Sequence, residues 1–485
     1  MSMKKKLSYI LSGILIIAFY SCKKLVEVDP PITRTTEGSV FSTDDNAIAV
    51  VTNIYESLSQ QDLSGNGSLM SLSAIGGLYA DELNLFDATN TGLNLFYTNS
   101  LNPTVTGPWG NYYATIFTTN TVLSGLGHSA TLSPAVKTQL KGEAEFIRAF
   151  CYFYLVNLYG DVPLVVTPDY KVNSVLSRSP VASIYQQITN DLLNAEADLS
   201  SDYLDGTLKP YGGSPERVRP AKAAATALLS RVYLYQQKYA EAEIYASKLI
   251  ADSTYALVPL DNVFLKNSKE AIWQIQPTLV TATQEGRFFV LPPGGPGMGQ
   301  PVYLSDTQLN VFDVGDGRRT KWIDIASGFY FDAKYKVGGI VVQAPVTTEY
   351  SMVLRLAEQY LIRAEARIKQ HKIDAGVGDL NILRGRARVA PTSQNPNPLP
   401  PLPIGMSAAN AMKAVERERQ CELFCEWGNR FFDLKRWPSA TNPSISLADE
   451  ELSQVKKNWK STDKFWPILQ DDIVKDPALK QNPGY

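Results

Sequence analysis

The chain contains little histidine and little cysteine. Only two of its 485 residues are histidines, His128 and His371, and only four are cysteines. The two histidines and four cysteines do not show the ligand spacing of a zinc site. Four cysteines are also too few for the dense disulfide framework of a small secreted domain. We therefore expect packing of the apolar residues, which make up 44% of the chain, to stabilise the fold.

The chain also has almost no net charge. Its 46 Lys and Arg residues are balanced by 48 Asp and Glu residues, which gives −2 at pH 7. Such a chain has no general electrostatic attraction for nucleic acid, so no nucleic-acid partner is expected. After residue 22, no apolar run approaches the roughly 20 residues that a membrane-spanning helix needs. The Gly-x-Ser-x-Gly and HExxH signatures of hydrolases do not occur either.

An export signal is present at the N-terminus. Lysines at positions 4–6 precede an apolar run over residues 7–20, and a small serine follows. The run is too short to span the roughly 30 Å core of a bilayer. We predict a signal peptide over residues 1–21 and a lipidated tether over residues 22–40, beginning at Cys22. The alternative is a secreted protein in which Cys22 carries no lipid.

The other three cysteines are expected to be free. Cys151 lies in an apolar helical pattern and should behave as a small buried hydrophobe. Cys421 and Cys425 are four residues apart, on one face of an expected helix. That spacing suits neither a zinc site nor a disulfide within one helical turn. We expect no metal and no cofactor here.

Most of the chain shows apolar residues at helical spacing, which predicts a mostly α-helical fold. Thr43 or the serine before it is expected to cap the first helix, and Gly160 to end the longest one. Helices are predicted over residues 43–58, 109–126, 134–159, 181–199, 220–237, 239–250, 352–370, 374–388 and 409–432.

Two of these helix pairs resemble tetratricopeptide units, in which small residues allow close helix contact. The second pair is weaker and rests on Ala366 and Ala375, nine residues apart. Two units are fewer than a free-standing solenoid needs, so we expect them to form a scaffold for other material. The residues that carry the first pair are Leu229, Ser230, Tyr233, Ala242 and Ala246.

Three segments are expected to be loops. Residues 86–108 are rich in Asn, Thr and Gly, residues 276–347 mix Pro, Gly and aromatics, and residues 391–405 are rich in proline. A structureless loop as long as residues 86–108 is uncommon unless it has a function. The glycine cluster at 291–301 lacks the Lys-Ser/Thr pair of a P-loop, so we interpret it as a loop without nucleotide chemistry.

The charged residues at 416–437 are expected to be structural. Glu418 and Glu422 alternate with Arg417 and Arg419, a pattern that favours ion pairs at i,i+4 on a helix over a pair of catalytic carboxylates. Asp313 and its neighbour three residues on, Asp316, are a weak candidate for calcium, and a turn is the preferred interpretation.

Aromatic side chains in the expected loops are candidates for ligand binding. Flat rings stack on the apolar faces of sugars, while neighbouring amide and guanidinium groups bind the hydroxyls. Packing in the core is the alternative for each of them. The candidates are Phe86, Phe96, Tyr97, Asn99, Arg287, Phe288, Tyr303 and Trp322.

Several phrases give the chain a family resemblance that runs nearly from end to end. Their order and spacing resemble the RagB/SusD family of outer-membrane nutrient-binding lipoproteins of Bacteroidetes. The phrases are SCKKLVEVDPP (21–31), LKGEAEFIRAFCYFYLVNLYGDVPLV (140–165), RPAKAAATALLSRVYLYQQKYAEAEIYASKLI (219–250), EAIWQI (270–275), VLRLAEQYLIRAEARI (353–368), ERERQCELFCEWGNRFFDLKRW (416–437), FWPIL (465–469) and QNPGY (481–485).

The resemblance implies tetratricopeptide-like helix pairs with a loop-rich irregular lobe, in one globular unit composed of residues 41–270 and 271–485. It implies a surface-facing outer-membrane lipoprotein that binds an oligosaccharide or glycan without catalysis. It also implies delivery to a SusC-like TonB-dependent barrel. Only Cys22 transfers by motif, as the lipid anchor. A secreted helical glycoside hydrolase, a lid protein that handles peptide or other non-sugar nutrients, and a scaffold that gates the barrel without touching substrate remain alternatives.

Overall fold

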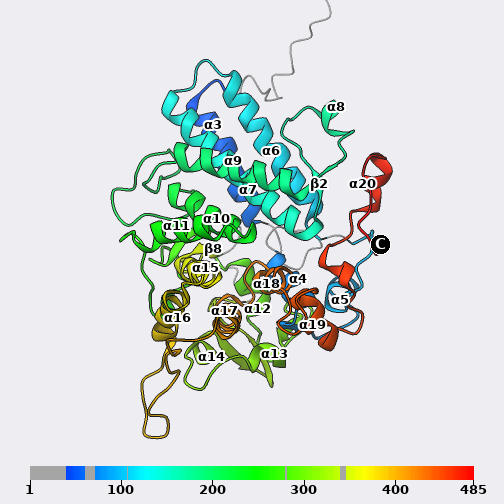
Figure 1. The fold of residues 1–485 in the computed structure, drawn as a ribbon. Helices are drawn as coiled ribbons and strands as arrows, with labels where there is room; N and C mark the ends of the chain where they lie inside the picture. The colour runs from blue at the N-terminus through cyan, green and yellow to red at the C-terminus, as the bar shows by residue number, and fades with distance from the viewer. Residues whose placement is uncertain (1–39, 61–70, 106, 279–280, 339–345) are drawn as a thin grey trace, which may run out of the picture.

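The structure is a computed structural model that describes residues 40–60, 71–105, 107–278, 281–338 and 346–485. Helices dominate it, and the strands of the described ranges pair only two by two (Figure 1). None of the helices in these ranges combines the length and the apolar character that crossing a bilayer would require. The predicted signal peptide, the tether up to residue 39 and Cys22 lie outside the described residues.

Four helices form one end of the molecule: α3 (Asp44–Ser59), α6 (Trp109–His128), α7 (Pro134–Tyr159) and α9 (Val181–Asp198). Helix α7 lies among the other three and is buried along most of its length (Figure 1). As predicted, the Thr43 side chain caps α3 by accepting from the backbone N–H of Asn46, and Gly160 follows α7 with a positive φ of 73°. Cys151 is buried in α7, also as predicted.

The predicted helix pairs form the middle of the molecule. Helix α10 (Lys222–Tyr235) packs on α11 (Tyr239–Ile250), α11 packs on α15 (Leu356–Lys369), and α15 packs on α16 (Ile373–Ala387). The small residues Ser230, Ala242 and Ala246 are fully buried at the first contact, as expected.

In the second pair, the close contact lies one residue beyond the predicted position. Ala375 is exposed, whereas Gly376 faces α15 so closely that an added Cβ would lie 2.7 Å from the carbonyl oxygen of Ala364. The residue that permits close helix packing here is therefore the glycine.

The helix predicted from residue 352 begins four residues later than expected. Residues Ser351–Arg355 form strand β8, which pairs antiparallel with β4 (Ala271–Ile275), and every residue of both strands is buried. A fully buried strand shows no alternation of polar and apolar residues, so its sequence does not differ from that of a buried helix.

Residues 86–108 and 276–347 contain more regular structure than predicted. The first segment includes α5 (Thr91–Tyr97), which is capped by Asn90. The second carries short helices and paired strands. Its elements are α12 (Gln284–Phe289), β5 (Val302–Leu304), α13 (Asp306–Leu309), α14 (Arg318–Lys321), β6 (Ile323–Ala326) and β7 (Phe329–Asp332).

The helix predicted over 409–432 is two helices, α17 (Ala408–Leu423) and α18 (Asn429–Arg436). Between them, Cys425, Trp427 and Gly428 have positive φ angles, which turn the chain. Cys425 is thus not on the same helix as Cys421, although both are free and buried, as expected. The remaining elements are α4 (Leu72–Tyr79), β1 (Leu83–Leu85), β2 (Val162–Pro163), α8 (Tyr170–Asn173), β3 (Arg178–Ser179), η1 (Leu260–Asn262), α19 (Leu447–Val455), η2 (Ser461–Lys464) and α20 (Gln470–Lys475).

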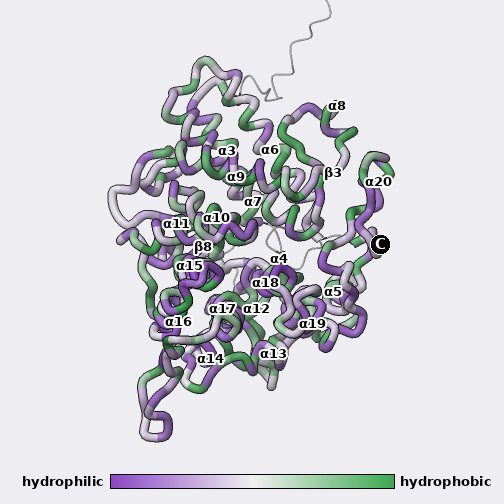
Figure 2. The backbone as a smooth tube through the Cα atoms, in the orientation of Figure 1, coloured by the Kyte–Doolittle hydropathy of each residue, from purple (hydrophilic) through white to green (hydrophobic). Residues whose placement is uncertain are grey.

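Hydrophobic and hydrophilic residues are mixed along the helices (Figure 2). In α3 the buried residues, among them Val51, Ile54 and Leu58, recur at the spacing of one helical face, so this face turns to the core. The two halves of the chain are interwoven in this core. Strand β1 of the N-terminal half pairs with β5 of the C-terminal half, and the ring of Tyr79 packs edge-on against those of Phe431 and Trp466.

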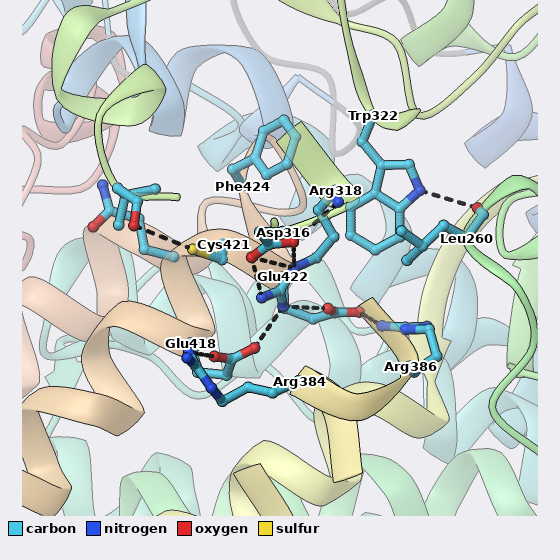
Figure 3. A network of polar contacts seen from close by, with 12 residues as sticks. Leu260, Asp316, Arg318, Trp322, Arg384, Arg386, Glu418, Cys421, Glu422 and Phe424 are labelled. Carbon is cyan, nitrogen blue, oxygen red and sulfur yellow. Dashed lines mark hydrogen bonds and ion pairs between the residues drawn. The ribbon is translucent and has the colours of Figure 1, made fainter. Parts of the chain in front are cut away.

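The charged residues of α17 form a buried ionic network, but not with the predicted partners. Arg318 of α14 binds Glu418 at 2.6 Å and Glu422 at 2.9 Å, and its own neighbour Asp316 at 2.6 Å (Figure 3). Arg384 and Arg386 of α16 pair with the same two glutamates, whereas the predicted partners Arg417 and Arg419 bind aspartates elsewhere. The ion pairs join separate elements and are not i,i+4 pairs on one helix.

Candidate ligand-binding surface

A short two-stranded sheet organises the candidate site. In it, Asn84 of β1 lies directly opposite Tyr303 of β5, and the backbone N–H of Phe86 donates to the carbonyl oxygen of Pro301 at 2.8 Å. Side chains alternate along a strand, and directly opposite residues share a face. Asn84, Phe86 and Tyr303 therefore lie on one face. The other face carries buried residues, namely Leu83, Leu85, Val302 and Leu304.

Aromatic rings cluster on the outer face of this sheet. Phe329, from β7, makes edge-to-face contacts with Phe86, at 5.5 Å between ring centroids, and with Tyr303, at 5.0 Å. Phe86 remains 48% exposed, and the other two rings are half-buried. Partial exposure leaves ring surface free for a ligand, while the mutual contacts hold the rings in place.

Tyr97 extends the cluster from α5. Its hydroxyl donates to Asn84 Oδ1 at 3.3 Å, and the ammonium group of Lys456 lies 4.4 Å from its ring centroid. Lys456 is the residue that follows α19, and α5 and α19 lie beside each other in Figure 1. We call Asn84, Phe86, Tyr97, Tyr303 and Phe329 together the aromatic surface.

A pocket of about 410 Å³ adjoins the aromatic surface and shares Asn84 and Tyr97 with it. We call it the polar pocket, because most of its lining side chains carry polar groups. Its volume lies within the range of small-molecule sites. The other lining residues are Asp81, Leu83, Thr98, Ser305, Asp306, Thr307, Val455, Lys456, Lys457 and Asn458.

Two ionisable groups at the polar pocket have strongly displaced pKa values. Burial lowers the pKa of the Lys456 ammonium to about 8, although the nearby Asp81 opposes the shift. Burial, with a contribution from Asp81, raises the pKa of the Glu82 carboxyl behind the pocket to about 8. Asp81 itself is bound by Arg430, whose Nε and Nη2 donate to the two carboxylate oxygens at 2.9 and 2.8 Å. Its charge is therefore engaged inside the protein.

Three of the predicted aromatic candidates lie in the core. Phe96 packs edge-on against Trp466 and Tyr79, Phe288 packs against Phe289, and the Trp322 indole donates to the carbonyl oxygen of Leu260. Their rings are closed to solvent, because each sits on the inward side of its element. Rings buried in this way are not open to stacking on a ligand.

The two predicted polar candidates, Asn99 and Arg287, lie away from the candidate binding surface. Asn99 is buried, and its side-chain amide donates to the carbonyl oxygen of Tyr79 at 3.0 Å. Arg287 is half-buried on α12 and donates to Gln284 Oε1 at 3.3 Å. Neither belongs to the aromatic surface or lines the polar pocket. Of the eight candidates, the structure brings together Phe86, Tyr97 and Tyr303.

Sequence reasoning missed Asn84, Phe329 and Lys456. Phe329 lies in the segment 276–347 that was expected to be a loop, and its FYFD run with alternate residues facing one side is a signal for a strand. Lys456 comes after a short polar helix in a region expected to be irregular. Nothing in its local sequence shows that the chain returns to α5.

The described ranges of the chain also show no sign of a metal site. Within those ranges, no group of three or more His, Cys, Asp or Glu side chains is arranged to hold a metal ion. Asp313 binds Arg384 and Arg417, and Asp316 binds Arg318. Arginines therefore occupy the carboxylates of the weak calcium candidate.

Comparisons with known proteins match both halves of the chain. Residues 311–485 match a family model described as the SusD family, and residues 28–234 match one described as "Starch-binding associating with outer membrane". SusD-like protein P2 of Formosa agariphila is 25% identical over an alignment of 539 positions, gaps included. The alignment covers 99% of this chain and 100% of that protein. The starch-binding protein SusD of Bacteroides thetaiotaomicron is 23% identical over 445 residues, which cover 74% and 75% of the two chains.

Solved structures share the fold. A structure described as a laminarin-binding SusD-like protein superposes with a TM-score of 0.70 at 21% identity, covering 90% of this chain and 99% of the other. This likeness confirms the predicted mostly helical fold class with its irregular lobe.

Proposed function

Because the chain belongs to the SusD family, we propose that it binds an oligosaccharide at the cell surface without catalysis. We further propose that it passes this ligand to a SusC-like TonB-dependent barrel in the outer membrane, with Cys22 as its lipid anchor. The aromatic surface is the proposed contact with the ligand, and the polar pocket receives one end of it.

The aromatic surface is the observation that carries this proposal. Phe86 directly follows β1, Tyr97 ends α5 and Tyr303 lies on β5, and each of the three residues is at least partly exposed. Ring faces of this kind stack on the apolar faces of sugars. The amide of Asn84, in their midst, offers donors and an acceptor for sugar hydroxyls. Rigid rings with a few convergent polar groups are typical of carbohydrate recognition.

The family comparisons support a glycan over other nutrients. One of the two matching family models is described as starch-binding, and one structural neighbour is described as laminarin-binding. Both are glucose polymers, so short glucans are the first ligands to try. A peptide is the competing ligand class, because stacked tyrosines and amides also bind extended peptides.

The association with the outer membrane has similar support. The model that matches residues 28–234 is described as associating with the outer membrane. A lipid on Cys22 would supply this association, since lipoproteins with more than one acyl chain are held stably. The barrel adds a second attachment, and the tether between them would let the protein move while it stays anchored.

Calorimetric titration of the purified protein with laminari-oligosaccharides and malto-oligosaccharides tests the proposal. We expect saturable binding, and we expect the double variant Phe86→Ala/Tyr303→Ala to lose about tenfold or more in affinity, since each stacking contact contributes about 0.5–1.5 kcal/mol. Tyr170→Ala is the matched control: this tyrosine on α8 is 71% exposed and lies on neither the aromatic surface nor the polar pocket.

Three results would contradict the proposal. If the double variant bound as tightly as Tyr170→Ala, the aromatic surface would not be the contact. If a peptide library gave specific binding and a broad oligosaccharide panel gave none, the ligand class would be wrong. Release of shortened sugars during the titration, followed by chromatography, would show catalysis and would favour the glycoside hydrolase alternative.

A further inference from the structure

Lys456 is a buried cation at the wall of the polar pocket. Its backbone N–H caps the C-terminal end of α19 by donating to the carbonyl oxygen of Leu452, and the residue is only 8% exposed. The ammonium group donates to the carbonyl oxygen of Leu78 at 2.7 Å and to that of Tyr97 at 3.1 Å. Within the described part of the chain, both of its hydrogen bonds thus go to neutral backbone groups and neither goes to a carboxylate.

The hydrogen-bonding capacity of this ammonium is not exhausted. A lysine ammonium has three N–H donors, and the structure accounts for two. The Tyr97 ring, with its centroid 4.4 Å from the ammonium, is the other group recorded against it, and Lys456 lines the polar pocket, so a molecule in that pocket can compete for the third N–H. A cation removed from water gains most from an anionic partner, since burial without one is costly.

The other charges around the pocket leave Lys456 uncompensated. Asp81 is the acid whose charge acts on Lys456, and Arg430 occupies both of its carboxylate oxygens. Asp306 is exposed at the start of α13, where solvent screens it. The exposed Lys457 adds a second positive charge at the rim. An anionic group in the pocket would therefore meet an ammonium that has no close counter-ion.

We propose that Lys456 selects an acidic sugar unit by donating its third N–H to an anionic oxygen, the carboxylate of a uronic acid or a sulfate ester. This inference rests on the proposed function, because it places a glycan across the aromatic surface with one unit in the polar pocket. It deepens that function by assigning a charge to the ligand. Lys456 contacts the ligand directly and also positions Tyr97 through its backbone carbonyl and its ring.

The acid–base properties of the site agree with this geometry. Burial holds the pKa of Lys456 at about 8 in the free protein. An anion bound beside it would raise that pKa, so affinity for an acidic ligand should fall as the pH rises through 8 and the ammonium is lost. The other titratable or charged groups at the pocket are Asp81 after α4 with its partner Arg430 on α18, Tyr97 on α5, Asp306 on α13 and the adjacent Lys457.

An array of oligosaccharides with matched backbones tests the inference. Each neutral member is paired with the same backbone carrying a uronate, and with one carrying a sulfate. We expect the protein to bind the acidic member of the preferred pair at least tenfold more tightly than the neutral one. Preference for uronate or for sulfate distinguishes the two sources of the anion.

Variants then separate ligand contact from a structural role. Lys456→Met should lower the ratio of acidic to neutral affinity, whatever it does to the neutral member through Tyr97, and Lys456→Arg should retain that ratio. Lys269→Met, an exposed lysine that does not line the pocket, is the control for lost surface charge. If Lys456→Met does not fold, Lys456→Arg and the pH dependence of the wild type still test the idea.

The other possible outcomes contradict either the role of Lys456 or the proposed function. Equal affinity for acidic and neutral members, or a Lys456→Met variant that loses both equally, overturns the inference and leaves the proposed function intact. A pH-independent preference for the acidic members also contradicts the role of Lys456. Failure of every glycan on the array to bind overturns the proposed function itself.

Discussion

Arg355 on β8 and Glu422 on α17 form a buried ion pair, with 2.6 Å between Nη1 and Oε1, although 67 residues separate them in sequence. Arg355 also binds Glu270, just before β4, and Glu426, which follows α17, both at 2.9 Å. Although burial opposes it, Arg386, Arg355 and Arg318 hold the pKa of the Glu422 carboxyl well below its usual range. One guanidinium thus ties a strand pair to a helix in the core.

Removing Arg355 should be strongly destabilising. Arg355→Met leaves the carboxylates of Glu422 and Glu270 buried with fewer partners, and breaking a buried pair in this way costs about 3–5 kcal/mol. Urea unfolding followed by circular dichroism measures the loss. Lys321→Met is the matched control. Its partner is Asp261, both side chains are about half exposed, and such pairs contribute about 1 kcal/mol or less. Similar losses in the two variants would contradict a structural role for the buried network.

Replacing two glycines of α16 by alanine, one at a time, should change the stability of the protein in opposite directions. Gly376→Ala places a Cβ 2.7 Å from the carbonyl oxygen of Ala364 and 2.6 Å from the Ile368 side chain, so α15 and α16 must separate. We expect a loss of about 1–3 kcal/mol, as for other overpacked contacts. Gly378→Ala meets no atom within 4 Å and should gain about 0.5–1 kcal/mol from helix propensity. Thermal unfolding of both variants checks the pair, and a gain in both would show that the two helices are not in close contact.

Glu82 should make stability depend on pH. Burial raises its pKa from 4.5 to about 8, so the folded state holds a proton that the unfolded state releases. The stabilisation is fully present below about pH 4.5 and is lost as the pH rises through 8. Glu82→Gln keeps the neutral form, so the wild type should lose stability relative to this variant between pH 5 and pH 8.5. Urea unfolding across that range measures the difference.

The matched control for this pH experiment is Glu241→Gln, because Glu241 is an exposed carboxylate on α11. Its stability difference from the wild type should change little over the same range. A constant difference between wild type and Glu82→Gln would show that Glu82 ionises equally in both states.

The lipid anchor can be tested directly in cells. We expect Cys22→Ala to release the protein from the outer-membrane fraction, because the thiol that would carry the acyl chains is absent. Residue 22 lies ahead of the first described helix, so the circular dichroism spectrum and the ligand affinity should not change. Fractionation followed by immunoblotting gives the distribution. A variant that stays with the membrane would show that the barrel or another contact holds the protein without a lipid.

Much of the helical scaffold could be predicted from local sequence alone. The pattern around Ser230, Ala242 and Ala246 identified a close helix pair, because small residues at that spacing have few other uses. The errors fall where local sequence is ambiguous. Strand β8 was predicted as the start of α15, because both segments are buried and largely apolar. Helix α5 was not predicted, because it lies in a segment rich in Asn, Thr and Gly.

The candidate site could be predicted only in part, for a physical reason. Phe86 and Phe96 are both aromatic residues in one polar segment, and their composition does not tell which one faces solvent. The pairing of β1 with β5 exposes Phe86, whereas packing against Trp466 buries Phe96. Exposure of a ring depends on contacts with residues hundreds of positions away.

The sequence by itself determined the helical scaffold and the family segments spread along the chain, and it predicts an export signal over residues 1–21 followed by Cys22. These are local patterns, encoded in spacing and residue type. Only the tertiary structure decided which charges pair and which side chains form a surface. The sequence predicts ion pairs of Glu422 within its own helix, whereas in the structure Glu422 binds Arg318 and Arg355 in a buried network. The structure also places Lys456 beside Tyr97. Such contacts arise from packing between distant segments, which no local pattern records.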